Sequence, residues 1–218
     1  EVARMYGYEN ISAKPLEGGA GEKVDQKLFN FIYNLKVTLS ELGLTEVQTY
    51  PYFSTKVLLS LGWNEDDNLR NLVKLLNPIS GETEYLRNNI WPNLLEVLDK
   101  NLRQNVKDVA VFEIGKVFDV KDETVKESWR LSMLISDKSG TEILQILKIF
   151  KNLSLDIEIK VTEPPGMAKI LFHPKKFVSL FHGEENVGGG AEVHPRILDK
   201  FGVNQKVAVL EINLDNLI

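Results

Sequence analysis

Cysteine is absent from the 218 residues of this chain. Without a thiol, the chain can form no disulfide, no thiolate zinc site and no cysteine nucleophile. Only three histidines occur, His173, His182 and His194, and their irregular spacing is not that of a zinc site. His173 and His194 are each followed by proline, so we expect them to fix turns or strand ends. Composition therefore excludes the common thiol and zinc chemistries and fits a reducing compartment.

Long apolar segments are also missing. No apolar run approaches the roughly 18 residues that would span a bilayer. The first ten residues, EVARMYGYEN, lack the basic flank and the apolar stretch of a signal peptide. We therefore expect a cytoplasmic protein with no membrane partner.

A strong positive charge is lacking as well. The chain has 26 basic and 31 acidic residues, which gives a formal net charge of -5. No global field therefore draws it towards a phosphate backbone. If the protein works beside RNA, other parts of its assembly should make most of the contacts.

One segment indicates a domain boundary. Residues 14–23 contain one proline and three glycines among polar residues, a composition typical of a linker. Residues 1–13 are then interpreted as the tail of a preceding domain. Residues 24–218 are interpreted as one folded module.

Apolar residues recur at helical spacing in several segments. The predicted helices are 24–42, 55–61, 91–102, 141–153 and 195–201. Pro92 suits the first turn of the third helix, where no amide donor is needed. Thr141 is predicted to cap the fourth helix, whose apolar residues nearly encircle it, so we expect that helix to be substantially buried.

Segments rich in β-branched and aromatic residues predict strands. The predicted strands are 45–53, 72–76, 109–120, 129–136, 156–161, 170–172, 178–182, 187–193 and 206–214. The charged stretch 121–127 is predicted to be a mobile hairpin loop. Mixed helices and hairpin-joined strands indicate an α+β fold, with an antiparallel β-sheet flanked by helices.

Four segments carry a more specific signal. They read EVARMYGYENI at 1–11, NPISGETEYLRNNIWPNLLEVLDKNLRQN at 77–105, VAVFEIGKVF at 109–118 and AEVHPRILDKFGV at 191–203. In the same order they resemble EEVARIYGYDNIP, NPLSxExSxLRTSLLPGLLxxLxxNxxR, LFEIGxVF and GEVHPxVLxxFGL of bacterial phenylalanyl-tRNA synthetase β chains. Each segment alone is a weak signal, but the ordered set is highly specific. The motif residues to which we assign structural roles are Arg87, Pro92, Glu113, Gly115, Glu192, His194 and Pro195.

The resemblance implies a fold and a role. The fold would be that of a class II aminoacyl-tRNA synthetase catalytic domain. The module would support the catalytic α subunit in an (αβ)2 assembly that charges tRNA(Phe) with L-phenylalanine. ATP and Mg2+ would serve that holoenzyme, and neither is expected to bind this fragment. The editing domain and the tRNA-contacting C-terminal domain of such β chains do not fit in this sequence, so we expect it to be part of a longer chain.

No catalytic residue is assigned to this chain. Class II synthetases stabilise the α-phosphate of ATP with arginines and magnesium. The resemblance aligns GKVFD at 115–119 with GRVYR of the catalytic subunit, so Asp119 stands where an arginine should be. Its carboxylate would repel a triphosphate, since unit charges ~4 Å apart interact by ~4 kcal/mol at an effective dielectric constant of 20. No GxGxR segment follows near the C-terminal end.

Three other features could be interpreted as functional sites. Arg87 and Glu113 match family positions, but a buried arginine–carboxylate pair inside a sheet would explain them equally well. Gly188–Gly190 lacks the GxxxxGKS/T spacing of a phosphate loop, so we predict a strand irregularity or turn. Glu1 corresponds to the last magnesium-binding carboxylate of the family. Alone it cannot hold the ion, which requires several oxygen ligands.

The helix at 24–42 falls where class II synthetases place their dimer-interface helix. We expect one face to contact the sheet and one edge to contact a partner. The residues predicted at the subunit interface are Leu28, Phe31, Leu35, Trp91 and Leu95. Two alternatives remain open: an autonomous adenylate-forming enzyme, which the missing arginines disfavour, and a stand-alone RNA-binding module, which the acidic charge and the lack of an aromatic-basic stripe disfavour.

Overall fold

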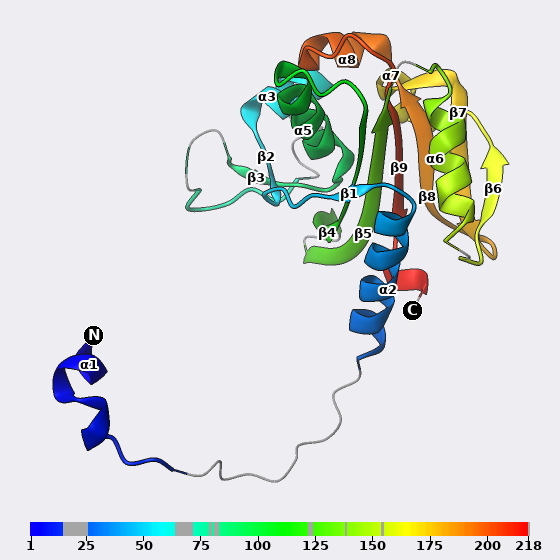
Figure 1. The fold of residues 1–218 in the computed structure, drawn as a ribbon. Coiled ribbons are helices and arrows are strands. Elements are labelled where there is room, and N and C mark those ends of the chain that lie inside the picture. The colour runs from blue at the N-terminus through cyan, green and yellow to red at the C-terminus, as the bar shows by residue number, and fades with distance from the viewer. Residues whose placement is uncertain are drawn as a thin grey trace.

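The computed structural model describes residues 1–14, 26–63, 72–78, 80, 83–121, 124–137, 139–153 and 155–217 (Figure 1). In these residues a 7-stranded sheet has the order β1-β4-β5-β9-β8-β7-β6. Its strands are β1 (Thr45–Glu46), β4 (Val109–Lys121), β5 (Thr124–Ser136), β6 (Glu158–Val161), β7 (Phe172–His182), β8 (Glu185–Val193) and β9 (Ala208–Asn213). All neighbouring strands are antiparallel except β1 and β4. The predicted α+β fold with a mainly antiparallel sheet is confirmed.

Helices cover both faces of this sheet (Figure 1). One face packs against α3 (Thr55–Leu61), α5 (Trp91–Arg103) and α8 (Pro195–Phe201). The other packs against α2 (Lys27–Glu41) and α6 (Glu142–Lys151). Because successive strand residues point to opposite faces, β4, β5, β7, β8 and β9 each contribute to two separate cores. The remaining short elements are α1 (Val2–Tyr6), η1 (Tyr8–Asn10), α7 (Ala168–Leu171) and η2 (Asp215–Leu217).

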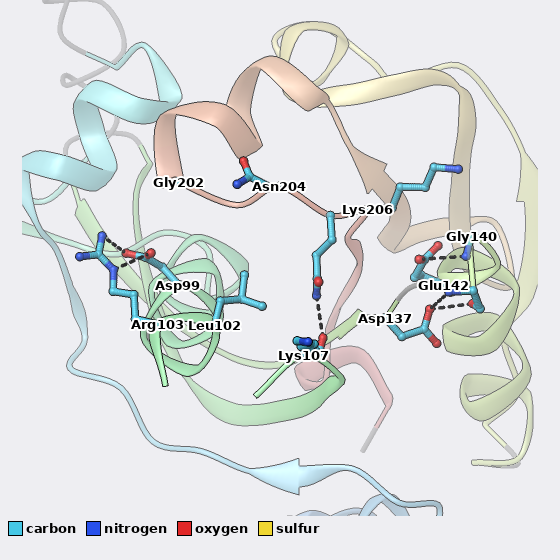
Figure 2. A pocket seen from close by; sticks show the side chains of 12 residues that line it. Asp99, Leu102, Arg103, Lys107, Asp137, Gly140, Glu142, Gly202, Asn204 and Lys206 are labelled. Carbon is cyan, nitrogen blue, oxygen red and sulfur yellow. Dashed lines mark hydrogen bonds and ion pairs between the residues drawn. The ribbon is translucent and has the colours of Figure 1, made fainter. Parts of the chain in front are cut away.

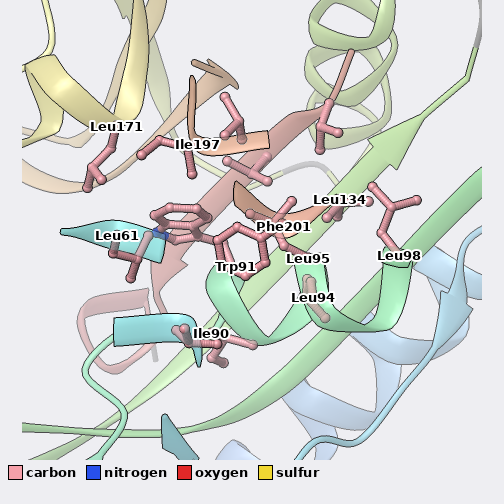
Figure 3. Close-up of a cluster of buried hydrophobic side chains, with 14 of the residues drawn as sticks. Leu61, Ile90, Trp91, Leu94, Leu95, Leu98, Leu134, Leu171, Ile197 and Phe201 are labelled. Atoms are coloured by element: carbon pink, nitrogen blue, oxygen red, sulfur yellow. The ribbon is translucent and has the colours of Figure 1, made fainter. Parts of the chain in front are cut away.

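The core beneath α5 follows from the apolar spacing of that helix (Figure 3). Leu94, Leu95 and Leu98 are fully buried and pack in one cluster with Leu134 of β5 and Phe201 of α8. As predicted, Pro92 occupies the first turn of the helix. This core fixes α5 over the centre of the sheet.

The opposite core joins α2 and α6 to the β4–β5 hairpin. Leu35 and Leu39 of α2 are buried beside Phe112 and Met133. Gly43 follows this helix with a φ of 92°, a backbone conformation that favours glycine. Gly43 therefore allows the chain to leave α2 and turn towards β1.

The first predicted strand is wrong in its extent. Residues 45–53 form two short strands instead of one, and they belong to different sheets. β1 pairs with β4, whereas β2 (Tyr52–Phe53) pairs with β3 (Tyr85–Leu86). Pro51 lies just before β2 and has no amide hydrogen to donate to a ladder. The strand predicted at 72–76 is also wrong, because only an isolated bridge between Lys74 and Tyr85 forms there.

Two other local predictions are corrected. The charged stretch at 121–127 is not a long loop, because β5 begins at Thr124 and Glu127 pairs opposite Phe118. The strand predicted at 170–172 begins only at Phe172, because α7 occupies Ala168–Leu171. The first prediction relied on local charge and the second on local β-propensity. Cross-strand pairing and packing decide these boundaries instead.

α6 also departs from expectation. Ile146 and Phe150 are buried, but Leu144 is largely exposed, so the helix is buried along one face only. Thr141 occupies the N-cap position, but its side chain accepts no cap hydrogen bond from the helix amides. No helix in the described residues is long and apolar enough to span a membrane. Most of the predicted linker, residues 15–23, lies outside the described residues.

Candidate functional site

A row of buried polar positions crosses the sheet beneath α5. In cross-strand register, Glu113 lies opposite Ser132, Ser132 opposite Glu211, Glu211 opposite Gly189, and Gly189 opposite Ser179. Their apolar neighbours along the strands belong to the opposite core, so these positions face α5. Buried polar side chains are costly unless they are paired. This polar row is therefore the candidate functional site.

An ion pair occupies the β4 end of the polar row. Nη2 of Arg87 lies 2.8 Å from Oε1 of Glu113, and both side chains are only 3% exposed. Thr49 closes the arrangement: its hydroxyl donates to Oε2 of Glu113 at 2.7 Å and accepts from Nη1 of Arg87 at 2.8 Å. Nε of Arg87 donates to the carbonyl of Lys116 at 3.1 Å. Each charge is thus satisfied by other groups of the chain.

Gly115 leaves room for this pair. A Cβ at this position would lie 2.5 Å from Nη2 of Arg87 and 3.2 Å from Oε1 of Glu113. Both distances are too short for unstrained contacts. The glycine of the motif is therefore explained by the space that the ion pair needs.

Glu211 connects β9 to the start of α5. Its Oε2 accepts hydrogen bonds from the backbone amides of Ile90 at 2.8 Å and Trp91 at 3.0 Å. The first amides of a helix lack partners within the helix and favour a negative charge. A carboxylate from a distant strand therefore fixes the N-terminal end of α5 on the sheet.

Arg130 is held less tightly than Arg87. Its contacts with Glu211, Asp119 and Asn89 measure 3.3, 3.5 and 3.5 Å. Charge-assisted hydrogen bonds are usually about 2.7–2.9 Å long. Its Nε is buried and has no partner within the described residues. Burial raises the pKa of Asp119, and the positive charge of Arg130 opposes that shift.

A small cavity adjoins the polar row. It has a volume of about 150 Å³ and lies over the backbone of Gly188–Gly190. Trp91, Phe172 and Phe177 form aromatic walls, and Arg130 lies among the polar lining residues. The arrangement combines an apolar recess with charged groups, but no nucleophile is paired with a base there.

Comparison with known proteins assigns the family. A profile described as "Phenylalanyl tRNA synthetase beta chain CLM domain" matches residues 11–214. The chain belongs to this family. It is 29% identical over 222 residues to the phenylalanine–tRNA ligase beta subunit of Clostridium tetani, and 29% identical over 231 residues to that of Rickettsia felis. All of this CLM-domain chain is covered, but only 28% and 27% of those relatives.

Solved structures show a similar fold. Two structures of pyrrolysyl-tRNA synthetase from Desulfitobacterium hafniense superpose with TM-scores of 0.68 and 0.69 at 19% identity. Each match covers 88% of the CLM-domain chain and 67% or 68% of the other chain. The likeness concerns the fold alone.

The other family-motif residues of the CLM-domain chain stabilise local structure. Glu192 is buried and forms an ion pair with Lys176. His194 precedes α8, which begins at Pro195, and its Nδ1 accepts the backbone amide of Arg196. His173 likewise accepts a backbone amide two residues later, from Lys175. The prediction that His173 and His194 fix turns or strand ends is confirmed.

Gly188–Gly190 lies within β8, beside a register shift between Leu180 and Phe181. The three glycines themselves pair in regular register with β7, and the irregularity lies next to them, at Val187. A Cβ on Gly188 would lie 2.2 Å from the carbonyl oxygen of Glu211. Close approach of β9 explains this glycine.

The residues predicted at the subunit interface need correction. Leu35, Trp91 and Leu95 are buried in the chain's own cores, because the faces that carry them pack on the sheet. Leu28 and Phe31 are partly exposed. A different edge of α2 is more exposed, formed by Phe29, Tyr33 and Val37.

Glu1 lies at the start of α1 and pairs with Arg4 at 2.6 Å on the surface. Among the residues that the structure describes, no group of three or more histidine, aspartate or glutamate side chains could hold a metal ion. A magnesium site at Glu1 would require further oxygen ligands. Glu1 alone therefore does not fit the ion.

A larger, polar groove lies at the C-terminal end of α5. It has a volume of about 990 Å³ and extends to the N-terminal end of α6 (Figure 2). Asp99 pairs there with Arg103 at 2.9 Å and with Lys56 at 3.1 Å. Hydrogen bonds from Ser139 lower the pKa of Asp137. Since neighbouring groups engage both carboxylates, we assign this groove no chemistry.

The Asp99 pairs predict a pH-dependent stability. We expect Asp99→Asn to lower the free energy of unfolding by about 0.5–1 kcal/mol at neutral pH, a small effect because both partners are partly solvated. Burial alone would raise the pKa of Asp99, but hydrogen bonds from Arg103 and Lys56 lower it. This stabilisation is present above the unfolded-state pKa and is lost as the pH falls through the lowered folded-state pKa. Urea unfolding at several pH values should show the difference vanish in acid; a constant difference would contradict it.

Several residues of the site were not predicted from sequence. They are Thr49, Asn89, Arg130, Ser132, Ser179 and Glu211. A signal was available for the last three, because each is a single polar residue inside an apolar strand segment: LSMLI, VSLF and VLEI. Such an interruption predicts a buried polar partner when the strand is buried on both faces.

Proposed function

We propose that this chain is the part of a phenylalanine–tRNA ligase β subunit that supports the catalytic α subunit and performs no chemistry itself. The balance of charges in the polar row and in the side chains paired with it carries this proposal. Two arginines, Arg87 and Arg130, face three carboxylates, Glu113, Glu211 and Asp119. A site that stabilises a triphosphate needs an excess of fixed positive charge. Here carboxylates outnumber arginines.

The names of the relatives support an assembly with a catalytic subunit. The relatives are named as beta subunits of phenylalanine–tRNA ligase, and the similarity to a pyrrolysyl-tRNA synthetase supports a class II synthetase fold. We place the chain in a cytoplasmic (αβ)2 assembly with the catalytic α subunit. That holoenzyme would use ATP and Mg2+ to charge tRNA(Phe) with L-phenylalanine, and the chain would meet tRNA only through it.

The exposed edge of α2 is the proposed contact with the α subunit. Phe29, Tyr33 and Val37 are 68%, 59% and 40% exposed. Their spacing of four residues aligns them along one edge of the helix. Large aromatic side chains on a surface commonly contribute most to a protein interface. This edge is exposed to solvent because α2 packs on the sheet through a different face, the one that carries Leu35 and Leu39.

Charge at this edge should prevent assembly. We expect the double variant Phe29→Glu/Tyr33→Glu to weaken association with the catalytic α subunit at least tenfold, since each aromatic side chain of an interface can contribute more than ~1 kcal/mol. The matched control Asn30→Glu/Asn34→Glu adds the same charge at exposed positions of the same helix. Light scattering behind a sizing column should show a mixed species for the control only. Equal behaviour of both variants would contradict the assignment.

The absence of chemistry is tested separately. The chain alone should support no phenylalanine-dependent exchange between ATP and diphosphate, whereas sustained exchange would favour an autonomous adenylate-forming enzyme. Filter binding of tRNA across a salt series tests the RNA-binding alternative. Tight binding by the chain alone, with a steep salt dependence, would support that reading.

A further inference from the structure

The cavity beside the polar row shares no lining residue with the edge of α2 that is proposed to contact the α subunit. We propose that it binds a small neutral molecule with one six-membered aromatic ring and one hydroxyl group. The binding surface is formed by Trp91, Phe172 and Phe177, by the backbone of Gly188–Gly190, and by Arg130. The proposal rests on the size, the walls and the polar side of the cavity.

The size of the cavity limits its ligand to one ring. Its volume is about 150 Å³, which is what an apolar cavity needs to hold benzene. Pockets for larger ligands usually measure about 300–1,000 Å³. A single substituted benzene ring therefore matches this volume, whereas a nucleotide or a peptide would extend beyond it.

The walls favour an aromatic ring over an aliphatic one. The rings of Trp91 and Phe172 lie 5.2 Å apart with an interplanar angle of 53°, and those of Phe172 and Phe177 lie 5.9 Å apart with an angle of 43°. Tilted rings present both faces and edges, and aromatic partners prefer offset or edge-to-face contacts. A planar ring can therefore make favourable contacts with this wall.

The glycines keep the cavity open. Gly188–Gly190 carries no side chains into the space between β7 and β9. Cζ of Phe177 lies only 3.2 Å from where a Cβ of Gly189 would be, so this ring lies against the strand backbone. Ala168 adds another small side chain to the lining. A larger residue at Ala168 would fill space that the structure leaves open.

The polar side of the cavity selects a hydroxyl group. Arg130 lines the cavity, and its Nη contacts with Glu211, Asp119 and Asn89 are 3.3–3.5 Å long, so its guanidinium N–H groups can still donate to a ligand. Among the described residues, Oε1 of Glu211 accepts one long contact, from Arg130 at 3.3 Å. A hydroxyl can accept from the first and donate to the second. A carboxylate on the ligand would instead be repelled by Glu211 and by Asp119, so a neutral group is favoured.

Three matched probes test the ligand class: 4-methylphenol, toluene and 4-methylbenzoate. The indole Nε1–H signal of Trp91 in a ¹H–¹⁵N spectrum of the full chain reports on the cavity. Variants Trp63→Phe and Trp129→Phe assign that signal, because the chain has three tryptophans. We expect saturable shifts at millimolar 4-methylphenol, at least threefold weaker binding of toluene, and at least tenfold weaker binding of 4-methylbenzoate. No shift of the Trp91 signal with any probe, or tightest binding of 4-methylbenzoate, would overturn the proposal.

Two variants locate the binding. Ala168→Leu should abolish the shift by filling the cavity, whereas Ile170→Leu, an exposed position of the same helix outside the lining, should leave it intact. Arg130→Met should remove the preference for 4-methylphenol over toluene while toluene still binds. Far-UV circular dichroism confirms that each variant is folded. A shift that persists in Ala168→Leu, or a preference that persists in Arg130→Met, would refute the site.

Discussion

Arg87→Met is expected to lower the free energy of unfolding by about 3–5 kcal/mol. The variant leaves Glu113 buried without its ion-pair partner, and among the described residues the Thr49 hydroxyl remains to hydrogen-bond it. Removing one partner of a buried ion pair typically costs this much, because the remaining charge is uncompensated. Urea unfolding followed by circular dichroism measures the loss.

Removing both charges should cost less than removing one. We expect Arg87→Met/Glu113→Leu to recover at least half of the lost stability, since a buried pair can often be replaced by apolar residues of similar volume. This outcome identifies the pair as a structural element of the sheet. An Arg87→Met variant as stable as the unaltered chain would contradict it and would reopen a functional role for Arg87.

Gly188→Ala is expected to be similarly severe. A Cβ there would lie 2.2 Å from the carbonyl oxygen of Glu211 and 2.8 Å from Cα of Ile212. Both are backbone atoms of β9, so no side chain can rotate to relieve the clash. β8 and β9 would have to separate at the centre of the sheet, with a loss of at least about 4 kcal/mol. Thermal unfolding and expression in soluble form both report this loss.

Gly190 provides the matched control in the same strand. A Cβ on Gly190 would meet only side-chain atoms, Cγ2 of Val178 at 3.3 Å and Cδ1 of Leu210 at 3.4 Å. These can shift by a few tenths of an ångström, so Gly190→Ala should cost about 1–2 kcal/mol. Equal effects of the two substitutions would show that the backbone of β9 does not limit the space at Gly188.

Local patterns predicted the helices better than the strands. The apolar spacing predicted α2, α5 and α8 to within a few residues, because helical periodicity is a local property. The two short strands at 45–53 could not be separated in this way. Their partners are β4 and β3, and local propensity does not specify which distant strand a segment will meet.

The site was predictable only where a motif marked it. Arg87 and Glu113 stand in family motifs, and the structural explanation offered for them agrees with the buried ion pair that they form. Arg130 and Glu211 are separated by 81 positions in the sequence and were missed. Their contact depends on the register between β5 and β9, which becomes apparent only in the folded sheet. The cavity likewise arises from three-dimensional packing around Gly188–Gly190.

The position of β9 has a consequence for how the protein folds during synthesis. The ribosome makes β9 after the other strands of the sheet, yet β9 lies between β5 and β8. Until it emerges, β1-β4-β5 and β8-β7-β6 are two ribbons with no hydrogen-bonded link, and α5 lacks the Glu211 carboxylate at its start. Such a nascent chain exposes two unpaired strand edges, which are prone to wrong association. We therefore expect completion of the sheet to be a late event, which has to wait until β9 has been synthesised.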